Sequence, residues 1–167
     1  MPETTGDSPP REVPGPVIEG LLLYQAETTL SKLVERSLLE FGLSTPQMLL
    51  LGALYWDGRP LVPRRIRNTL VVEAQSLTGL IDRLEAQGLA QRLSHPKDRR
   101  KIRVQITPKG RKRYEEASAR SDKTLETYFK ALTLRERQQL RTAMYKLRGA
   151  GYQPLGLVHK AAYPQPS

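Results

Sequence analysis

The segment that decides the fold is SLTGLIDRLEAQGLAQRLSHPKDRRKIRVQIT, residues 76–107, because the spacing of its apolar residues changes along its length. Its first part carries apolar residues at the i, i+3, i+4 and i+7 positions of one helical face: Leu77, Leu80, Ile81 and Leu84. Its last part, from Ile102 to Thr107, alternates apolar and polar residues, which is typical of a half-buried strand. Residues 89–93 form a second strand candidate, and a His-Pro-Lys-Asp turn lies between the two strands. The segment therefore predicts a helix followed by a hairpin with a basic tip.

The positive charge of the chain is concentrated around this hairpin. The formal net charge is +10, and ten of the 27 Lys and Arg residues lie between Arg92 and Arg113, where Asp98 is the single acid. A block of like charge is often only a solvated face, and it is equally typical of a surface that binds nucleic acid. Spacing alone leaves both interpretations open.

Length and composition exclude several classes of protein. A chain of 167 residues is long enough for one domain with a real core. The absence of Cys excludes disulfides, thiolate metal sites and cysteine redox switches, and two His without a glycine-rich phosphate loop offer no catalytic or metal-ligand set. We therefore expect no enzyme activity, no metal and no cofactor. The N-terminus lacks signal-peptide character and no apolar run approaches the roughly 18 residues of a membrane span, so we expect a cytoplasmic protein with no membrane partner.

Capping signals divide the rest of the chain into helices. A long first helix is predicted up to Phe41, and Ser44 to Gln47 has the capping pattern that opens a second helix. Residues 63–70 predict a short third helix, so the helix of the opening segment would complete a helix-turn-helix. Thr107 and Thr133 supply capping hydroxyls for two further helices, and Gly149 and Gly151 are expected to end the last one. The predicted fold class is mainly α with a small β-hairpin.

Residues 76–110, SLTGLIDRLEAQGLAQRLSHPKDRRKIRVQITPKG, resemble the MarR family of bacterial transcription regulators. The family pattern T-x-x-(I/V)-D-R-L-E-x-x-G-L corresponds to Thr78–Leu89, and D-x-R…(L/I)-T-x-x-G corresponds to Asp98–Gly110. The resemblance implies a winged helix-turn-helix with N- and C-terminal dimerisation helices. Its expected parts are a disordered tail at 1–16, a dimerisation region at 17–43 and 108–148, a DNA-binding domain at 44–107 and a C-terminal tail at 149–167.

The resemblance also implies a function. The chain is expected to be a sequence-specific transcription regulator, a repressor, which binds double-stranded DNA as a homodimer at an inverted-repeat operator. Its recognition helix would enter the major groove and its wing the minor groove. The alternatives are a non-specific architectural DNA binder and a winged helix that binds another protein. For the terminal helices, packing within one chain is the alternative to dimerisation.

Three sets of residues are candidates for DNA contact. The recognition helix would present Gln75, Ser76, Thr78, Gly79 and Arg83 to the major groove. The wing would contact DNA through Lys97, Asp98, Arg99, Arg100 and Lys101, with Arg100 inserted in the minor groove and Asp98 orienting it. Phosphate contacts are expected from Arg64, Arg65 and Arg67. Gly79 permits close approach of the helix backbone to DNA, or is a tolerated surface glycine.

Four further points stay open at the level of sequence. Asp82 either pairs with a wing arginine or faces solvent, and an alternative for Lys97, Arg92 and Arg103 is that they only solvate the hairpin. Val71 occupies a turn position where relatives often have Gly, which leaves the turn geometry uncertain. The resemblance also makes a small-molecule effector possible, in a pocket between the dimerisation helices and the DNA-binding domain. The aromatic residues Tyr24, Trp56 and Tyr128 are candidates for its lining, or are plain core.

Overall fold

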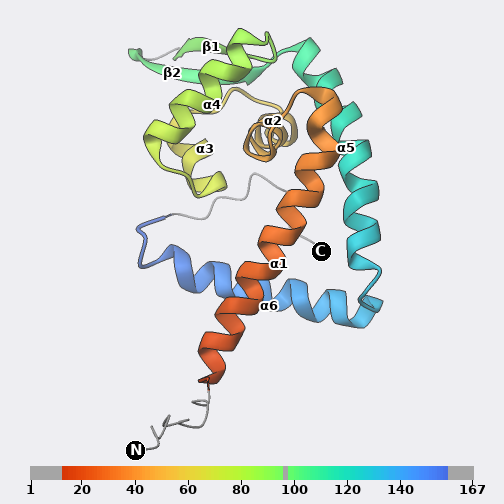
Figure 1. Cartoon of the computed structure of the whole chain (residues 1–167). Coiled ribbons are helices and arrows are strands. Elements are labelled where there is room, and N and C mark those ends of the chain that lie inside the picture. The colour runs from red at the N-terminus through yellow and green to blue at the C-terminus, as the bar shows by residue number, and fades with distance from the viewer. Residues whose placement is uncertain (1–12, 96–97, 158–167) are drawn as a thin grey trace, which may run out of the picture.

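The computed structural model describes residues 13–95 and 98–157, which form helices and one antiparallel hairpin (Figure 1). The tip residue Lys97 and the segments 1–12 and 158–167, which hold most of both expected tails, lie outside the described residues. The elements in chain order are α1 (Gly15–Leu38), a 3₁₀ turn η1 (Leu39–Phe41), α2 (Thr45–Asp57), α3 (Pro63–Leu70), α4 (Ala74–Ala86), β1 (Ala90–His95), β2 (Asp98–Ile106), α5 (Pro108–Phe129) and α6 (Leu134–Tyr152). The predicted class, mainly α with a small hairpin, is confirmed.

Helix α2 is the centre around which the other elements of the upper part pack. Figure 1 views it nearly end-on, with α3, α4 and the hairpin on one side and α1 and α5 on the other. Its residues Leu50, Leu51 and Leu54 are at most 1% exposed. Fully buried side chains come from α1, α3, α4, the start of the hairpin and β2, namely Leu38, Ile66, Ile81, Leu84, Leu89 and Val104, and α5 adds Ala117. Burial of such a side chain stabilises the fold by about 1.5–3 kcal/mol, so this cluster fixes the relative positions of α3, α4 and the hairpin.

The predicted capping signals are formed, and they explain where the helices begin. Ser44 and Gln47 make reciprocal side-chain to backbone hydrogen bonds at the start of α2, and Thr133 and Glu136 do the same at α6. Thr107 caps α5 by accepting a hydrogen bond from the backbone N–H of Gly110 at 3.0 Å. Within the described ranges, no helix combines the length and the apolar character that crossing a membrane requires.

Two predicted helix boundaries are wrong. Helix α1 begins at Gly15, within the segment expected to be a tail, because Pro16 suits the first turn of a helix. Helix α6 continues through Gly149 and Gly151 to Tyr152. A glycine inside a helix costs only about 1 kcal/mol relative to alanine, and the Tyr152 hydroxyl donates to the Asn68 carbonyl of α3 at 3.3 Å, which holds the last turn in place.

The start of α5 is packed directly on the base of the hairpin. A Cβ at Gly110 would lie 2.0 Å from the carbonyl oxygen of Leu89 and 2.9 Å from Cγ1 of Ile106, so only glycine fits there. The Thr107 backbone N–H donates to the same Leu89 carbonyl at 3.1 Å, and the Thr107 hydroxyl donates to the Gly88 carbonyl at 2.7 Å. The glycine of the family pattern is therefore a packing requirement.

The hairpin register contains an irregularity close to its tip. Ser94 pairs with Ile102 but His95 pairs with Asp98, so residues 99–101 are extra residues on the β2 side. At the other end, Leu61 adds a short bridge to Val104 with two hydrogen bonds of 2.8 Å. Val104 and Ile106 are buried as the alternation predicts, whereas Ile102, nearer the tip, is 39% exposed.

The turn between α3 and α4 contains a strained residue. Val71 caps α3 with φ 53° and ψ 50°, and it is the one non-glycine residue with positive φ in the described part of the chain. This left-handed conformation costs an L residue about 1–2 kcal/mol, and a β-branched side chain tolerates it poorly. The turn thus adopts the geometry that suits glycine, although the sequence places valine there.

We expect Val71→Gly to raise the free energy of unfolding by about 1 kcal/mol, because glycine adopts positive φ without steric cost. The Val71 side chain is 50% exposed, so little buried area is lost. Urea denaturation of the two proteins measures the difference. The matched control is Val72→Gly, which removes a side chain packed on the core and should destabilise. A Val71→Gly protein less stable than the parent would contradict the strain argument.

Candidate nucleic-acid interface

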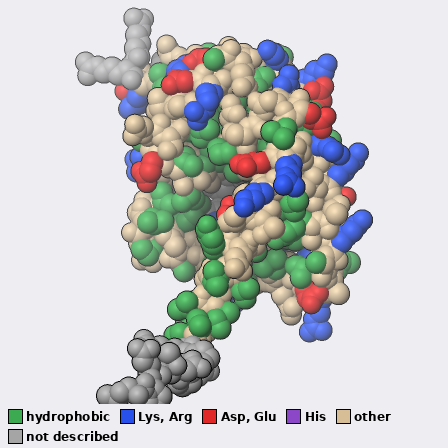
Figure 2. Space-filling model, in the orientation of Figure 1, with side chains coloured by type: hydrophobic (Ala, Val, Ile, Leu, Met, Phe, Trp, Pro, Cys, Tyr) green, Lys and Arg blue, Asp and Glu red, His purple; other side chains and the backbone are tan. Residues whose placement is uncertain are grey.

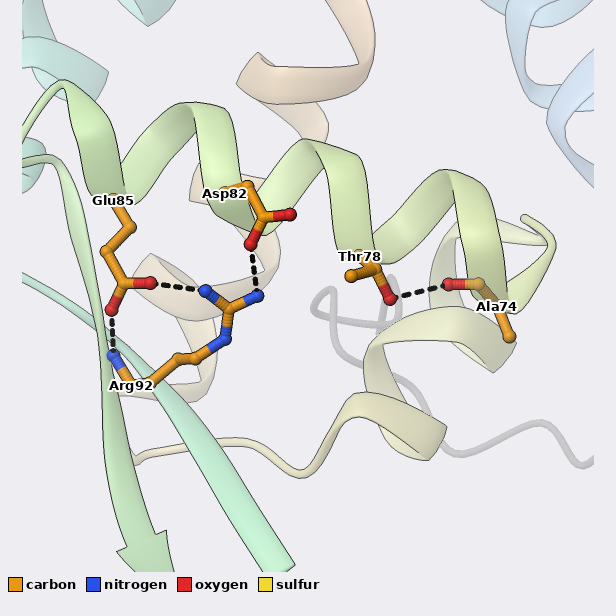
Figure 3. Close-up of polar contacts among 5 residues, drawn as sticks. All are labelled: Ala74, Thr78, Asp82, Glu85 and Arg92. Carbon is orange, nitrogen blue, oxygen red and sulfur yellow. Dashed lines mark hydrogen bonds and ion pairs between the residues drawn. The ribbon is translucent and has the colours of Figure 1, made fainter.

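Helix α4 has one buried face and one outward face. Leu77, Leu80, Ile81 and Leu84 are at most 5% exposed, which confirms the predicted core face. The predicted contact residues Gln75, Ser76, Thr78 and Arg83 are all exposed, and Gly79 is partly exposed among them. The Thr78 hydroxyl donates to the Ala74 carbonyl at 3.1 Å, and its oxygen keeps lone pairs that face solvent (Figure 3). The fold therefore brings the five predicted residues onto one accessible surface.

Packing within the chain does not require glycine at position 79. The nearest atoms to a methyl group added there would be the Arg83 guanidinium nitrogens, at 3.9 and 4.0 Å, which is ordinary contact distance. This differs from Gly110, where a backbone carbonyl excludes any side chain. A requirement for glycine at 79 would have to come from a molecule that approaches α4 from outside.

Arg92 ties the hairpin to α4. Its guanidinium donates to Asp82 Oδ1 at 2.5 Å and to Glu85 Oε2, while Glu85 Oε1 accepts the Arg92 backbone N–H at 2.9 Å (Figure 3). Of the two interpretations of Asp82, the pairing with a wing arginine is the one observed. The interpretation of Arg92 as a solvating residue is wrong, because both carboxylates lie on the helix beside it. The hydrogen bond to Asp82, and secondarily that to Glu85, raises the pKa of Arg92.

Arg103 also has a role within the hairpin. Its Nη2 donates to the Ser94 carbonyl across the two strands at 3.3 Å, so it too does more than solvate the hairpin. The wing-tip irregularity places Arg99, Arg100 and Lys101 in the extra residues of β2. Lys101 pairs with Asp98 at 3.0 Å. The side chains of Arg99 and Arg100 lie outside the described residues, as does Lys97, so their predicted roles stay predictions.

The three arginines predicted to contact phosphate differ in their surroundings. Arg64 is exposed and Arg67 is partly exposed on α3. Arg65 forms an ion pair with Asp57, whose side chain is only 3% exposed, and Asp57 also pairs with Arg59 at 3.3 Å. Asp57 therefore joins the end of α2 to α3. This contact holds Arg65 in place, and its side chain remains 31% exposed.

A cavity of about 350 Å³ lies between α1, α2 and α5. The sequence candidates for such a pocket do not line it: Tyr24 is 67% exposed, Trp56 donates to the Tyr114 hydroxyl at 2.9 Å, and the Tyr128 hydroxyl donates to the Ala26 carbonyl at 3.2 Å. Tyr114 does line it, together with Ser118 and Ser121. The sequence did carry a sign of this cavity: Ser118 and Ser121 are small polar residues at helix positions of α5, spaced three and four apart, where larger apolar residues would be expected to pack.

Apolar side chains are exposed at the end of the molecule opposite the hairpin. Figure 2 shows them covering the N-terminal part of α1, where this helix projects beyond the rest of the chain. Six of them between Val17 and Tyr24 are 44–67% exposed. Helix α6 adds Leu140, Met144 and Leu147, which are 37–59% exposed. These exposed apolar residues lie together on two helices, whereas the exposed apolar residues of a typical monomer are scattered singly.

Comparison with known proteins gives one consistent result. A sequence profile described as MarR family matches residues 41–101. The HTH-type transcriptional regulator PecS of Dickeya dadantii (strain 3937) is 30% identical over 99 residues, 56% of this chain and 60% of PecS. The transcriptional activatory protein BadR of Rhodopseudomonas palustris (strain ATCC BAA-98 / CGA009) is 37% identical over 94 residues, 53% of this chain and 52% of BadR. The chain thus spans little more than half the length of these curated relatives.

The fold comparison extends over more of the chain. The solved structure of Bordetella bronchiseptica BpsR, described as showing how 6-hydroxynicotinic acid regulates its DNA binding, superimposes with a TM-score of 0.71 at 26% identity. The superposition covers 77% of this chain and 97% of BpsR. Residues 41–101 therefore match the MarR family in sequence, and the winged helix-turn-helix and these relatives support a MarR-family winged-helix protein.

Proposed function

We propose that the chain is a cytoplasmic DNA-binding transcription regulator that represses transcription as a homodimer on an inverted-repeat operator. The observation that carries this proposal is the Arg92 bridge, which holds a basic wing at a fixed angle to the outward face of α4. Two rigidly joined elements of this kind suit two adjacent grooves of one duplex. The relatives PecS and BadR are named as transcriptional proteins, and neither is named as an enzyme.

The outward face of α4 suits the major groove. Gln75, Ser76 and Thr78 carry uncharged donors and acceptors, which match the donor and acceptor patterns of base edges. Gly79 lets the helix backbone approach closely, and Arg83 adds a cation at the next turn of the helix. A non-specific architectural protein needs positive charge but not this uncharged polar face, and a protein-binding module does not need the basic wing.

The wing and α3 supply the sequence-independent part of binding. Arg100 inserts into the narrow minor groove, and Lys97, Arg99 and Lys101 contact the flanking phosphates, with Asp98 shaping the tip. Arg64, Arg65 and Arg67 contact phosphates from α3, and Asp57 fixes the position of Arg65. Each such contact releases a counterion, which makes affinity depend steeply on salt.

The terminal helices form the dimer interface. Regions 17–43 and 108–148 carry it, and the exposed apolar residues of α1 and α6 support it because a monomer would leave them in water. The winged domain at 44–107 is then held by α1 and α5 at each side of a two-fold axis. The segments 1–16 and 149–167 belong to neither the dimerisation region nor the winged domain. Helix α1 extends two residues into the first segment, and α6 extends four residues into the second.

A small-molecule effector regulates DNA binding through the cavity between α1, α2 and α5. BpsR, whose DNA binding responds to 6-hydroxynicotinic acid, supports this proposal by its similarity of fold and sequence. The cavity touches α1 and α5 of the dimerisation region and α2 of the winged domain. A ligand there favours one relative position of these helices, which changes the spacing of the two recognition helices.

We expect the protein to have twice its chain mass of 18.9 kDa in solution at micromolar concentration. Leu22→Glu or Leu147→Glu should yield monomers, because each would place a charge in the dimer interface. Light scattering after size exclusion measures the mass. Ile102→Glu is the control, since Ile102 is 39% exposed in β2 and lies outside both regions assigned to the dimer interface. A dimer unaffected by both interface variants would contradict this assignment.

We expect Arg100→Ala to weaken operator binding by about 1–3 kcal/mol per subunit. The salt slope, which is the slope of log affinity against log salt concentration, should become shallower by about one unit. Gln75→Ala and Thr78→Ala should instead relax the preferred sequence at a nearly unchanged salt slope, because no ionic contact is lost. Fluorescence anisotropy on an inverted repeat with half-sites about 10 bp apart, and on a scrambled duplex, separates these effects. Lys130→Ala, at the far end of α5, controls for lost charge. If all three variants bound like the parent, the protein-interaction alternative would gain.

We expect Arg92→Ala to weaken operator binding without changing the salt slope, because Arg92 positions the wing and contacts no phosphate. The unfolding free energy should fall by about 1 kcal/mol, a modest value since both carboxylates are more than one-third exposed and screened by solvent. Arg92→Lys should restore charge but only part of the binding, because the lysine ammonium lacks the planar fork by which two guanidinium nitrogens reach Asp82 and Glu85. A salt slope reduced by one unit in Arg92→Ala would show that Arg92 contacts DNA.

A further inference from the structure

We propose that the cavity between α1, α2 and α5 selects a small amphipathic cation, with an ammonium or amidinium group on an apolar body, and disfavours anions. This inference rests on the proposed effector-regulated function and names the chemical class of the effector. The cavity has walls from three helices, so the argument concerns which chemistry those walls offer.

The apolar part of the wall suits a hydrocarbon or aromatic body. Leu30 and Val34 of α1, Met48 of α2 and Leu125 of α5 line the cavity. Met48 belongs to the buried core and Val34 packs against it, which makes this side of the cavity firm. Burial of an apolar body against these side chains provides affinity but no discrimination by charge.

The charged part of the wall is entirely acidic. Glu27 of α1 and Asp122 of α5 line the cavity, and none of its described lining residues is a lysine, arginine or histidine. This is unusual in a chain with a formal net charge of +10. An anion entering the cavity would meet two carboxylates without a neutralising side chain, whereas a cation would find two partners.

Glu27 has a hydrogen-bond partner in the cavity wall, and the charge of Asp122 acts on a second wall residue, Tyr114. The Glu27 Oε1 atom accepts a hydrogen bond from the Ser31 hydroxyl, one turn along α1, at 2.7 Å, and Ser31 is itself a lining residue. Asp122 acts on the wall residue Tyr114: burial first, and the negative charge of Asp122 as well, raises the pKa of Tyr114, so its phenol stays neutral. Both side chains are exposed to solvent, and both lie at the wall of the cavity.

The hydroxyl groups of the wall complete a site for a hydrogen-bond donor. Thr45 lines the cavity, and its Oγ1 atom is buried with no hydrogen-bond partner among the described residues. The buried Ser121 hydroxyl gives its proton to the Ala117 carbonyl at 2.9 Å, which leaves its oxygen as an acceptor. An ammonium group has three donors and no acceptor, so it satisfies carboxylate and hydroxyl oxygens together. A buried unpaired hydroxyl is costly until such a partner arrives.

The test uses two pairs of probes that share an apolar body and differ in charge: 4-phenylbutylamine with 4-phenylbutyrate, and tryptamine with indole-3-acetate. Isothermal titration of the full-length dimer should give amine dissociation constants at least about tenfold lower than those of the paired acids. Amine binding should weaken as salt rises, because both carboxylates are exposed to solvent.

Charge-neutral variants identify the site. Asp122→Asn and Glu27→Gln should each weaken amine binding by about threefold to tenfold and reduce the discrimination against acids. Glu116→Gln and Glu35→Gln are the matched controls, because these exposed carboxylates lie on the same two helices but do not line the cavity. Thermal denaturation of each variant verifies that it is folded before titration.

Several results would overturn the inference. The first is that either acid, or 6-hydroxynicotinic acid, binds more tightly than the amines. The second is that neither amine binds up to millimolar concentration. The third is that the cavity variants and the control variants lose amine affinity equally. Operator binding measured with and without amine separates this inference from the proposed function. An amine that binds with the expected charge dependence but leaves operator affinity unchanged would confirm the selectivity and reject regulation. A protein that binds no DNA would reject the regulator and leave the titration result standing.

Discussion

The bridge from Arg92 to Asp82 and Glu85 is the interaction on which the proposed DNA-reading geometry depends. A two-stranded hairpin has little independent stability and would swing about its base if only its buried end were fixed. The core holds that end through Leu89, Val104 and Ile106. The Arg92 guanidinium adds attachment farther along β1, and the Glu85 carboxylate also engages the backbone. Because these groups are partly exposed, their main contribution is orientation and not stability.

The bridge also explains which parts of this arrangement could be predicted from sequence. Apolar spacing predicted α4 and the hairpin because burial of a continuous face or of alternate residues is a local requirement. Capping residues predicted the starts of α2, α5 and α6 for the same reason. The sequence offered the pairing of Asp82 with a wing arginine as one of two interpretations. It did not identify Arg92 or Glu85, because the pairing joins residues of two elements whose relative placement depends on the core. Val71 shows a different limit, since tertiary packing imposes a backbone conformation that its own side chain disfavours.

The cavity could not be predicted for a third reason. Its walls come from three helices that are distant in sequence, and its volume is what their side chains leave unfilled. Aromatic residues drew attention as candidates, yet Trp56 and Tyr128 are used for contacts that join helices. The informative residues were small and polar. Ser118 and Ser121 occupy seam positions of α5, where larger apolar side chains would have closed the gap between α5 and α1.

Helix α5 connects the cavity to the wing, and its first turn is packed against the hairpin base with no room for a side chain at Gly110. Its middle part, at Ser118 and Asp122, lines the cavity. Its first turn lies against the hairpin base at Gly110, where even one added carbon would collide with the Leu89 carbonyl. A helix transmits displacement along its axis because its backbone hydrogen bonds resist bending. A ligand that shifts α5 relative to α1 must therefore move the hairpin base, and through Arg92 the hairpin and α4 would move as one unit. Under the proposed function, the contacts that fix the wing for DNA binding would therefore also make it respond to a ligand in the cavity.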